Sequence, residues 1–313
     1  MPNVVLLFPG QGSQSPGMGK ELAARFPVAR EVFLAADDAI NAPLSRLCFE
    51  GPEEALTLTL NAQPALLTHG AAVWAVIRDV IGPHVVAAAG HSLGEFTAYH
   101  AAGAIPLREA VQLVRTRGQL MYDAGVHRPG GMAAILGETN IPICEVCEIA
   151  SEAGVVVPAN FNAPGQVVVS GEDTGVERAM AVAKEHGAKR TIKLKVSGAF
   201  HSPLMDDASA GLKAALDLTH LAAPDFPIYS NVNAQPVAEV ALARQLLLDQ
   251  LTLPVQWTRE VEAIASRYPD ALYVEMGPGH VLRGLVRKIH PTGHVIPCST
   301  AADVDALFAL VTT

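Results

Sequence analysis

The segment VVAAAGHSLGEFTAYHAAG, residues 85–103, limits the possible folds of this chain more than any other part of the sequence. It passes from an apolar run through Gly-His-Ser-Leu-Gly into a helix-like stretch. Gly90 and Gly94 allow a strand and a helix to approach closely around a sharp turn that carries Ser92. The segment therefore predicts a strand–turn–helix unit with Ser92 as a candidate nucleophile. The alternative is an ordinary glycine-rich turn capped by a serine.

Strand-like and helix-like segments alternate along most of the chain, which predicts an α/β fold with a mainly parallel sheet. The predicted strands of this sheet are Val4–Phe8, Val85–Ala89, Pro227–Ser230, Ala271–Glu275 and His294–Pro297. The predicted helices between them include Ala62–Ile81, 92–102 and 106–122.

The middle of the chain has a different order of elements: strand, helix, strand, strand, helix, strand. This is the order of a ferredoxin-like α+β unit. The predicted elements are Gly131–Leu136, Pro142–Ala153, Val155–Pro158, Gln166–Ser170, Thr174–His186 and Thr191–Val196. We therefore predict a large hydrolase-like α/β body, residues 1–125 and 199–313, interrupted by a ferredoxin-like subdomain at 126–198. A cleft between the two is the expected ligand site.

Composition excludes several classes of protein. The 313 residues are 50% hydrophobic, which is enough for a large core. The sequence has no run of about 18 apolar residues, so we expect no membrane span. The first residues lack the cationic region of a signal peptide. Four scattered cysteines indicate a reducing compartment, so we expect a cytoplasmic protein. A net charge of −9 argues against nucleic-acid binding.

The best candidate for a base that activates Ser92 is His201, in the segment GAFHSPLM. Ser202 has the character of a helix N-cap and Pro203 that of the first helical residue. His201 therefore precedes a helix N-terminus, where partial positive charge disfavours the imidazolium form and leaves a ring that accepts a proton.

Two other histidines compete with His201. His91 is adjacent to Ser92, but neighbours along an extended turn point in different directions, so we expect it to form a wall of the site. His280 is the alternative base, because α/β-hydrolases place their catalytic histidine late in the chain.

Arg117 lies on the apolar stripe of its helix, in LREAVQLVRTRGQLM at 107–121. The other residues of that stripe are Ala110, Leu113, Val114 and Met121. A guanidinium on a core-facing stripe requires an anionic partner, and arginine binds carboxylates in bidentate fashion. The partner is either an internal Asp or Glu or the free carboxylate of a substrate.

The first predicted strand ends in FPGQGSQSPGMGKE, residues 8–21. This turn lacks the third glycine of a dinucleotide fingerprint and the Lys-Ser or Lys-Thr pair of a phosphate-binding loop. It presents Gln11 at the carboxyl end of a strand, where α/β sheets bind ligands. Backbone N–H groups at this turn are candidates for an oxyanion hole.

Taken together, these motifs resemble those of the malonyl-CoA:acyl carrier protein transacylases of fatty acid synthesis. The resemblance covers essentially the whole chain and follows one order. Its motifs are FPGQGSQ, NAQPALLTHG at 61–70, GHSLGEFTA at 90–98, VRTRGQLM with Arg117, NFNAPGQVVVSG at 160–171, GAFHSPLM at 198–205, SNV at 230–232 and EMGPGHVL at 275–282.

The resemblance implies a role for each candidate residue. Ser92 is the nucleophile, His201 its base, and Arg117 the partner of the malonyl carboxylate. The backbone amides of Gln11 and Leu93 form the oxyanion hole. The remaining implied residues are Gln250, whose carbonyl orients the histidine, and the wall or supporting residues His91, Gln63, Asn160, Asn162 and Phe200. A phenylalanine before the base is associated with selection of malonyl over methylmalonyl groups.

The implied reaction transfers a malonyl group from malonyl-CoA to the phosphopantetheine thiol of acyl carrier protein, through a malonyl-serine ester. The coenzyme A thioester is then a substrate, and no bound cofactor or metal is needed. We expect a monomer that binds no nucleic acid or membrane. The alternatives are the acyltransferase subunit of a malonate decarboxylase, a serine esterase and, against the intact set of site residues, a non-catalytic scaffold.

Two further patterns carry weaker predictions. Five basic residues, Lys184, Lys189, Arg190, Lys193 and Lys195, crowd the end of the predicted subdomain. They are either a docking patch for an acidic carrier protein or a solvated face. Cys144 and Cys147 form a lone C-x-x-C without a second ligand pair, so we expect both to be ordinary helix residues.

Overall fold

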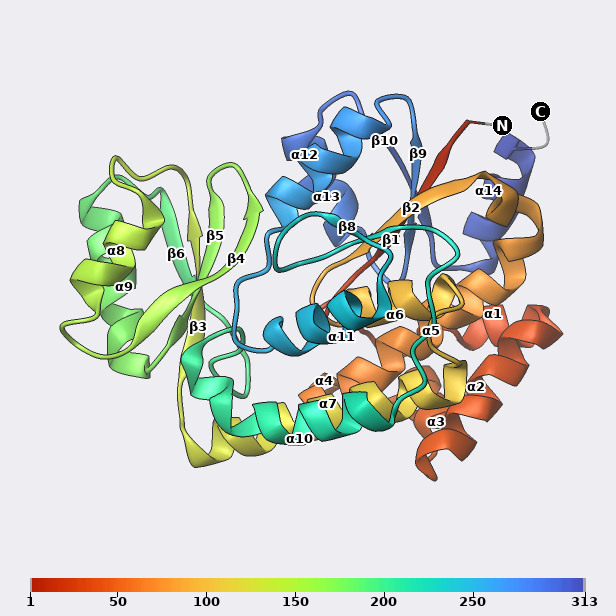
Figure 1. The fold of residues 1–313 in the computed structure, drawn as a ribbon, viewed down its shortest axis with the longest axis horizontal. Helices are drawn as coiled ribbons and strands as arrows, with labels where there is room; N and C mark the ends of the chain where they lie inside the picture. Colours follow the sequence, from red (N-terminus) through yellow and green to blue (C-terminus); the bar gives the residue numbers. More distant parts are fainter. Residues whose placement is uncertain (1, 312–313) are drawn as a thin grey trace.

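The computed structural model describes residues 2–311, which form two β-sheets with helices packed around them (Figure 1). The larger sheet has six strands in the order β10-β9-β1-β2-β7-β8. These strands are β1 (Val4–Phe8), β2 (Val85–Gly90), β7 (Ile228–Tyr229), β8 (Pro236–Val237), β9 (Leu272–Met276) and β10 (His294–Cys298). All pair in parallel except the edge strand β8, which runs antiparallel to β7.

The central strand β1 shows why the larger sheet needs helices on both faces. Its sequence VVLLF is buried at every position, as expected of a strand covered on both sides. Val4 and Leu6 belong to the main core, whereas Val5 and Leu7 pack in a second core with Trp257. Alternation along one strand therefore supplies two hydrophobic layers.

Most of the helices surround this larger sheet (Figure 1). They are α1 (Lys20–Arg25), α2 (Pro27–Ile40), α3 (Leu44–Glu50), α4 (Glu53–Thr57), α5 (Thr59–Ile81), α6 (Leu93–Ala101), α7 (Leu107–His127), α10 (Asp206–Leu218), α11 (Val240–Asp249), α12 (Trp257–Arg267), α13 (Val281–Ile289) and α14 (Ala301–Val311). Two short 3₁₀ turns, η1 (Gly82–His84) and η2 (Pro203–Met205), complete the set.

Helix α5 is apolar enough to be compared with a membrane span, although the sequence predicted none. With the turn that follows it, residues Thr59–His84, it is long and apolar enough to cross a membrane, with a mean hydropathy of 1.3. However, 61% of that apolar window is buried inside the protein, against α7, α2 and α6. The helix is therefore accounted for as a core helix, although its composition alone would not distinguish the two cases.

The smaller sheet has four antiparallel strands in the order β4-β5-β3-β6. They are β3 (Gly131–Leu136), β4 (Val156–Ala163), β5 (Gln166–Gly171) and β6 (Arg190–Lys193). Helices α8 (Ile143–Ala150) and α9 (Asp173–Glu185) share a separate core with one face of this sheet. The predicted fold class, a mainly parallel α/β sheet with a smaller antiparallel α+β unit, is confirmed.

The two strands whose ends differ most from prediction are β4 and β6. Strand β4 extends to Ala163, well past the predicted end at Pro158, because it pairs with β5 over this length and also bonds to the body. Phe161 N donates to Val255 O at 2.9 Å, and Val255 N donates to Ala159 O at 2.9 Å. Strand β6 ends at Lys193, before the predicted end at Val196. The next residues turn away and line the cavity described below.

Candidate active site

Ser92 occupies a strained turn between β2 and α6. Its φ and ψ of 51° and −108° lie in a region that non-glycine residues rarely adopt. The two flanking glycines are required by close contacts: a Cβ on Gly90 would lie 1.9 Å from the carbonyl carbon of Gly94. A Cβ on Gly94 would lie 2.0 Å from the carbonyl oxygen of Phe8. The turn therefore has the geometry of a nucleophile elbow.

Asn231 holds this turn in place from the loop after β7. Its Oδ1 accepts from Ser92 N at 2.7 Å, and its Nδ2 donates to Gly90 O at 2.7 Å. Nδ2 also lies 3.0 and 3.1 Å from the two carboxyl oxygens of Glu260, which is fully buried. Burial raises the pKa of Glu260 well above its usual value, and the nearby Glu95 raises it further.

Sequence reasoning missed the roles of Asn231 and Glu260. The SNV motif contributed to the family resemblance, but no role followed from it. A buried glutamate on α12 has no distinguishing sequence signal, since only the folded chain brings it to Asn231.

Ser92 and His201 form a hydrogen-bonded pair. The Ser92 Oγ lies 2.8 Å from His201 Nε2, and His201 Nδ1 lies 2.7 Å from the backbone oxygen of Gln250. Because a carbonyl only accepts, Nδ1 carries the proton and Nε2 is left to accept the serine proton. The carbonyl of Gln250 thus faces the histidine at the position that the resemblance implies.

Burial is the main reason that the His201 ring is neutral. The ring is 4% exposed, and burial lowers its pKa to about 3, with the positive charge of Arg117 as the next cause. The predicted N-cap is present, since Ser202 accepts from Leu204 N. The 3₁₀ turn there runs directly into α10, so His201 does precede a helical N-terminus, and burial is a further cause of neutrality that the sequence did not indicate.

The competing histidines have other positions. His91 Nε2 lies 2.7 Å from Asn162 Oδ1, and its ring packs against Trp257, with centroids 5.7 Å apart. Burial lowers the pKa of His91. His280 is exposed at the N-terminus of α13 and does not line the cavity that contains Ser92.

Arg117 is buried on α7, with 1% of its surface exposed, as its place on the apolar stripe predicts. Its guanidinium donates to Gln63 Oε1 at 2.7 Å, to Gln250 Oε1 at 2.8 Å and to Ser92 Oγ at 3.2 Å. No carboxylate of residues 2–311 pairs with it directly, and burial lowers its pKa to about 10. The internal ion pair considered for this arginine is therefore not found there, and a buried cation faces the nucleophile.

A cavity of about 120 Å³ contains the Ser92 and His201 side chains. It is lined by Gln11, Gln63, His91, Ser92, Leu93, Arg117, Met121, Met132, Asn160, Leu194, Val196, Phe200 and His201. All predicted site residues lie on this wall except Gln250, which contacts Arg117, and Asn162, which contacts His91. The body supplies the polar reacting groups, and the smaller sheet and the segment after it supply Met132, Asn160, Leu194 and Val196.

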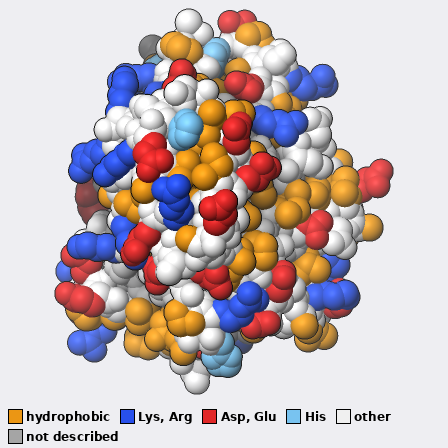
Figure 2. Space-filling model, turned by 90° about the vertical axis from the view of Figure 1, so that its left-hand side faces the viewer, with side chains coloured by type: hydrophobic (Ala, Val, Ile, Leu, Met, Phe, Trp, Pro, Cys, Tyr) orange, Lys and Arg blue, Asp and Glu red, His pale blue; other side chains and the backbone are white. Residues whose placement is uncertain are grey.

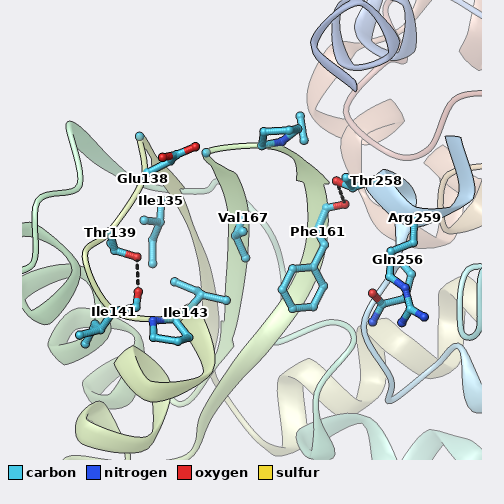
Figure 3. Close-up of a pocket in the computed structure, with 15 residues that line it drawn as sticks. Ile135, Glu138, Thr139, Ile141, Ile143, Phe161, Val167, Gln256, Thr258 and Arg259 are labelled. Carbon is cyan, nitrogen blue, oxygen red and sulfur yellow. Dashed lines mark hydrogen bonds between the residues drawn. The ribbon is translucent and has the colours of Figure 1, made fainter. Parts of the chain in front are cut away.

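A second cavity, of about 500 Å³, lies between the smaller sheet and α12 (Figure 3). Ile135, Phe161 and Val167 form its apolar wall, and Arg259 stands on the α12 side. It contains none of the predicted site residues, so size alone does not identify the reactive site. Within residues 2–311, no group of three or more His, Cys, Asp or Glu side chains is arranged to hold a metal ion.

Comparisons with known proteins identify the family of this chain. Residues 5–298 match the family described as acyl transferase domain. A malonyl CoA-acyl carrier protein transacylase from Bacillus subtilis (strain 168) is 45% identical over 292 residues, 93% of this chain and 91% of the relative. One from Salmonella typhimurium is 42% identical over 312 residues and 100% of both chains.

Solved structures give the same result. An acyl-carrier-protein-S-malonyltransferase from Bartonella henselae has a TM-score of 0.94 and 40% identity, covering 99% of this chain and all of its own. A malonyl-transacylase in complex with its type II PKS acyl-carrier protein has a TM-score of 0.93 and 38% identity, covering 98% of this chain and 99% of that one.

Proposed function

This chain belongs to the acyl transferase family, among the malonyl CoA-acyl carrier protein transacylases, and from that premise we propose how its residues carry the reaction. It transfers a malonyl group from malonyl-CoA to the phosphopantetheine thiol of acyl carrier protein, supplying extender units for fatty acid synthesis. The transfer proceeds through an ester on Ser92. The observation that carries this proposal is the buried Arg117, which faces Ser92 Oγ and has no carboxylate of residues 2–311 in direct contact.

The first half of the reaction forms the ester. His201 Nε2 takes the proton of Ser92 as Oγ attacks the thioester carbonyl, a step supported by their 2.8 Å separation. The Ser92–acyl bond forms and the bond to sulfur breaks. Coenzyme A leaves as its thiol after taking the proton from His201. Burial lowers the pKa of His201, so the ring is neutral before and after this step. For the same reason, the protonated ring that forms between them readily gives up its proton.

The oxyanion of the tetrahedral intermediate is held by the backbone amides of Gln11 and Leu93. Leu93 begins α6, so its N–H lies in the first turn, where helices have no internal acceptor. Gln11 follows β1 and also lines the cavity, and its side-chain Oε1 accepts a hydrogen bond from Thr59 Oγ1 at 2.7 Å. Such donors typically contribute about 3 kcal/mol each to transition-state stabilisation.

Arg117 selects the acyl group and directs its fate. A malonyl carboxylate next to the guanidinium can form a bidentate ion pair with it, which an acetyl group cannot form. The same pairing holds the ester in a small cavity with little room for water, which favours thiol attack over hydrolysis. The thiol of acyl carrier protein then gives its proton to His201 and attacks the ester carbonyl. The bond to Ser92 Oγ breaks as His201 returns the proton to that oxygen.

The remaining properties follow from this reaction. The coenzyme A thioester is a substrate, and we assign no resident cofactor. All four cysteines are free, three of them buried, which supports the proposal that the protein acts in the reducing cytoplasm. We expect a monomer that meets acyl carrier protein transiently.

Mass spectrometry of the intact protein after mixing with malonyl-CoA or acetyl-CoA tests the proposal. We expect a malonyl adduct on Ser92 that is long-lived in water and is discharged by a pantetheine thiol. Acetyl-CoA should label the protein far less. Ser92→Ala should abolish the adduct, and Arg117→Ala should remove the preference for malonyl. Rapid hydrolysis of the adduct, or equal labelling of the wild type by both thioesters, would overturn the proposal in favour of an esterase.

A further inference from the structure

Glu95 is a buried carboxyl group one helical turn from the nucleophile, and the mechanism above does not use it. It lies in the first turn of α6 with no exposed surface. Its Oε2 accepts from Gln250 Nε2 at 2.6 Å and from Asn231 N at 3.3 Å. A buried carboxyl group without an adjacent cation is costly, so its retention beside the reactive serine needs a reason.

Gln250, the partner of Glu95, is hydrogen-bonded to several other principal residues of the site. Its Nε2 donates to Glu95 and, at 3.0 Å, to the backbone oxygen of Ser92. Its Oε1 accepts from Arg117 at 2.8 Å, and its backbone oxygen faces His201 Nδ1 at 2.7 Å. One residue therefore contacts the nucleophile, the base and the carboxylate-binding cation.

The side-chain amide of Gln250 is nearly symmetric in shape but not in chemistry. If it turned over, its NH₂ group would face the guanidinium, donor against donor, and its oxygen would face the carboxyl of Glu95. An ionised carboxylate accepts hydrogen bonds and donates none, so ionised Glu95, together with the backbone oxygen of Ser92, favours the orientation in which the amide nitrogen faces them. The amide oxygen is then left for Arg117.

We propose that Glu95 is a positioning residue for malonyl selection: through Gln250 it fixes the guanidinium of Arg117 beside Ser92. The inference rests on the function proposed above. Arg117 makes its only described contact with the nucleophile through Nη2, the same nitrogen that donates to Gln250 Oε1. If Gln250 Oε1 no longer accepts from Arg117 Nη2, this nitrogen loses the hydrogen bond that holds it near Ser92 Oγ.

Electrostatics support the same link. Burial raises the pKa of Glu95 to about 7, while hydrogen bonds from Gln250, Asn231 and Ser230 and the charge of Arg117 oppose the rise. In turn, the charge of Glu95 raises the pKa of Arg117 against the larger effect of burial. Carboxyl and guanidinium therefore stabilise each other's charged forms across the amide, although they are not in contact.

Two substitutions at position 95 separate orientation from mere packing. Glu95→Gln keeps an amide oxygen that can accept from Gln250, so we expect the ratio of malonyl to acetyl kcat/KM to stay within about 3-fold of the wild type. Glu95→Met keeps the volume but removes the acceptor, and we expect that ratio to fall at least 10-fold. The reaction of Ser92 with a small sulfonyl fluoride, which has no carboxylate for Arg117, should change less than 3-fold in both variants.

Gln250→Met supplies a second test that leaves Glu95 in place and keeps the backbone oxygen that faces His201. It should show the same loss of selectivity, and the double variant should lose no more than Gln250→Met alone. This variant carries the test if Glu95→Met fails to fold.

Three results would overturn the role of Glu95: equal losses for malonyl and acetyl in folded Glu95→Met, a loss in Glu95→Gln as large as in Glu95→Met, or unchanged selectivity in Gln250→Met. A wild type without malonyl preference in the same assay would instead overturn the proposed function on which this inference rests.

Discussion

In the body, the polar groups around Ser92 are buried and bonded to one another, whereas in the smaller sheet most charged side chains lie in water. Glu95, Glu260, Arg117 and Gln250 are each at most 1% exposed. By contrast, the ion pairs of the smaller sheet, such as Lys193 with Asp173, are about half exposed. Figure 2 faces this smaller unit and shows basic and acidic side chains interspersed over its surface.

This difference separates two tasks. Buried, mutually bonded groups hold reacting atoms to fixed positions, because each alternative arrangement leaves a polar group unpaired. Exposed charges contribute little to stability and remain available to a partner. We therefore expect substitutions in the body to alter stability and chemistry strongly. Substitutions in the smaller sheet should alter access and docking more weakly.

The largest effect should come from the elbow. Gly94→Ala places a Cβ 2.0 Å from the backbone of Phe8, which cannot move without displacing β1. We expect a loss of about 4 kcal/mol in the free energy of unfolding, measured by urea titration. Gly284→Ala on α13 is the matched control, since a Cβ there meets nothing within 4 Å. It should be neutral or stabilising by up to about 1 kcal/mol. Equal midpoints for the two variants would show that the elbow tolerates a side chain.

The elbow was also the part of the site that the sequence revealed best. Two glycines flanking a serine between an apolar run and a helix are local signals, so Ser92 could be predicted from adjacent residues. Arg117 could be predicted from one helix face, and His201 from its place before a cap. These are periodic or short-range patterns, so they can be recognised in the sequence before the fold is known.

The network around the elbow could not be predicted in the same way. Asn231 and Gln250 lie far from Ser92 in the sequence and bond to it only in the folded chain, and Glu260 is linked to it only through Asn231. The extension of β4 has a partly similar origin, because its last residues pair with Val255 of the body as well as with β5 of its own unit. Propensity and periodicity contain no information on such contacts, except where a family resemblance supplies it.

The next effect concerns pH and the buried base. The pKa of His201 is lowered from 6.5 to about 3, so the unfolded chain takes up a proton below pH 6.5 that the folded protein does not. Stability contributed by this group is therefore present above pH 6.5 and is lost as the pH falls. Between pH 6.5 and 4.5 the loss amounts to about 2–3 kcal/mol.

Unfolding free energies of His201→Ala and the wild type, compared across that pH range, measure this contribution. The variant should lose less stability on acidification, by the stated amount. Ser92→Ala removes the partner of the ring but keeps the ring, and it should retain most of the wild-type slope. Parallel curves for His201→Ala and the wild type would contradict a neutral buried histidine.

A smaller effect should arise where the smaller sheet meets the body. Asn162→Ala removes the partner of His91 Nε2 at 2.7 Å and leaves a buried ring nitrogen unpaired, which costs about 1–2 kcal/mol. Because His91 lines the cavity, transfer of malonyl and acetyl groups should fall together, with their ratio unchanged. Asn140→Ala removes a similar pair with His186 that is exposed, and it should cost less than about 0.5 kcal/mol. A change in acyl selectivity in Asn162→Ala would instead place Asn162 in the recognition of malonyl.

The smallest effect should come from the basic residues at the end of the smaller sheet. Lys193 is engaged by Asp173 at 2.9 Å and Glu177 at 3.1 Å, so it contributes little free charge. Lys189 and Arg190 are exposed, and no ion pair within residues 2–311 includes either of them. We propose that these two attract the acidic carrier protein during encounter.

Reversal of both charges, Lys189→Glu with Arg190→Glu, should raise the KM for acyl carrier protein about 5-fold, close to 1 kcal/mol, by weakening electrostatic attraction. The KM for malonyl-CoA should not change, because the cavity around Ser92 contains neither residue. Arg46→Glu with Lys213→Glu makes the same change in net charge on the body surface and should leave both constants as they are. Because exposed charges are screened, the effect should shrink as salt is added. An equal rise in both KM values, or the same rise in the control, would assign these residues to the general charge of the protein rather than to docking.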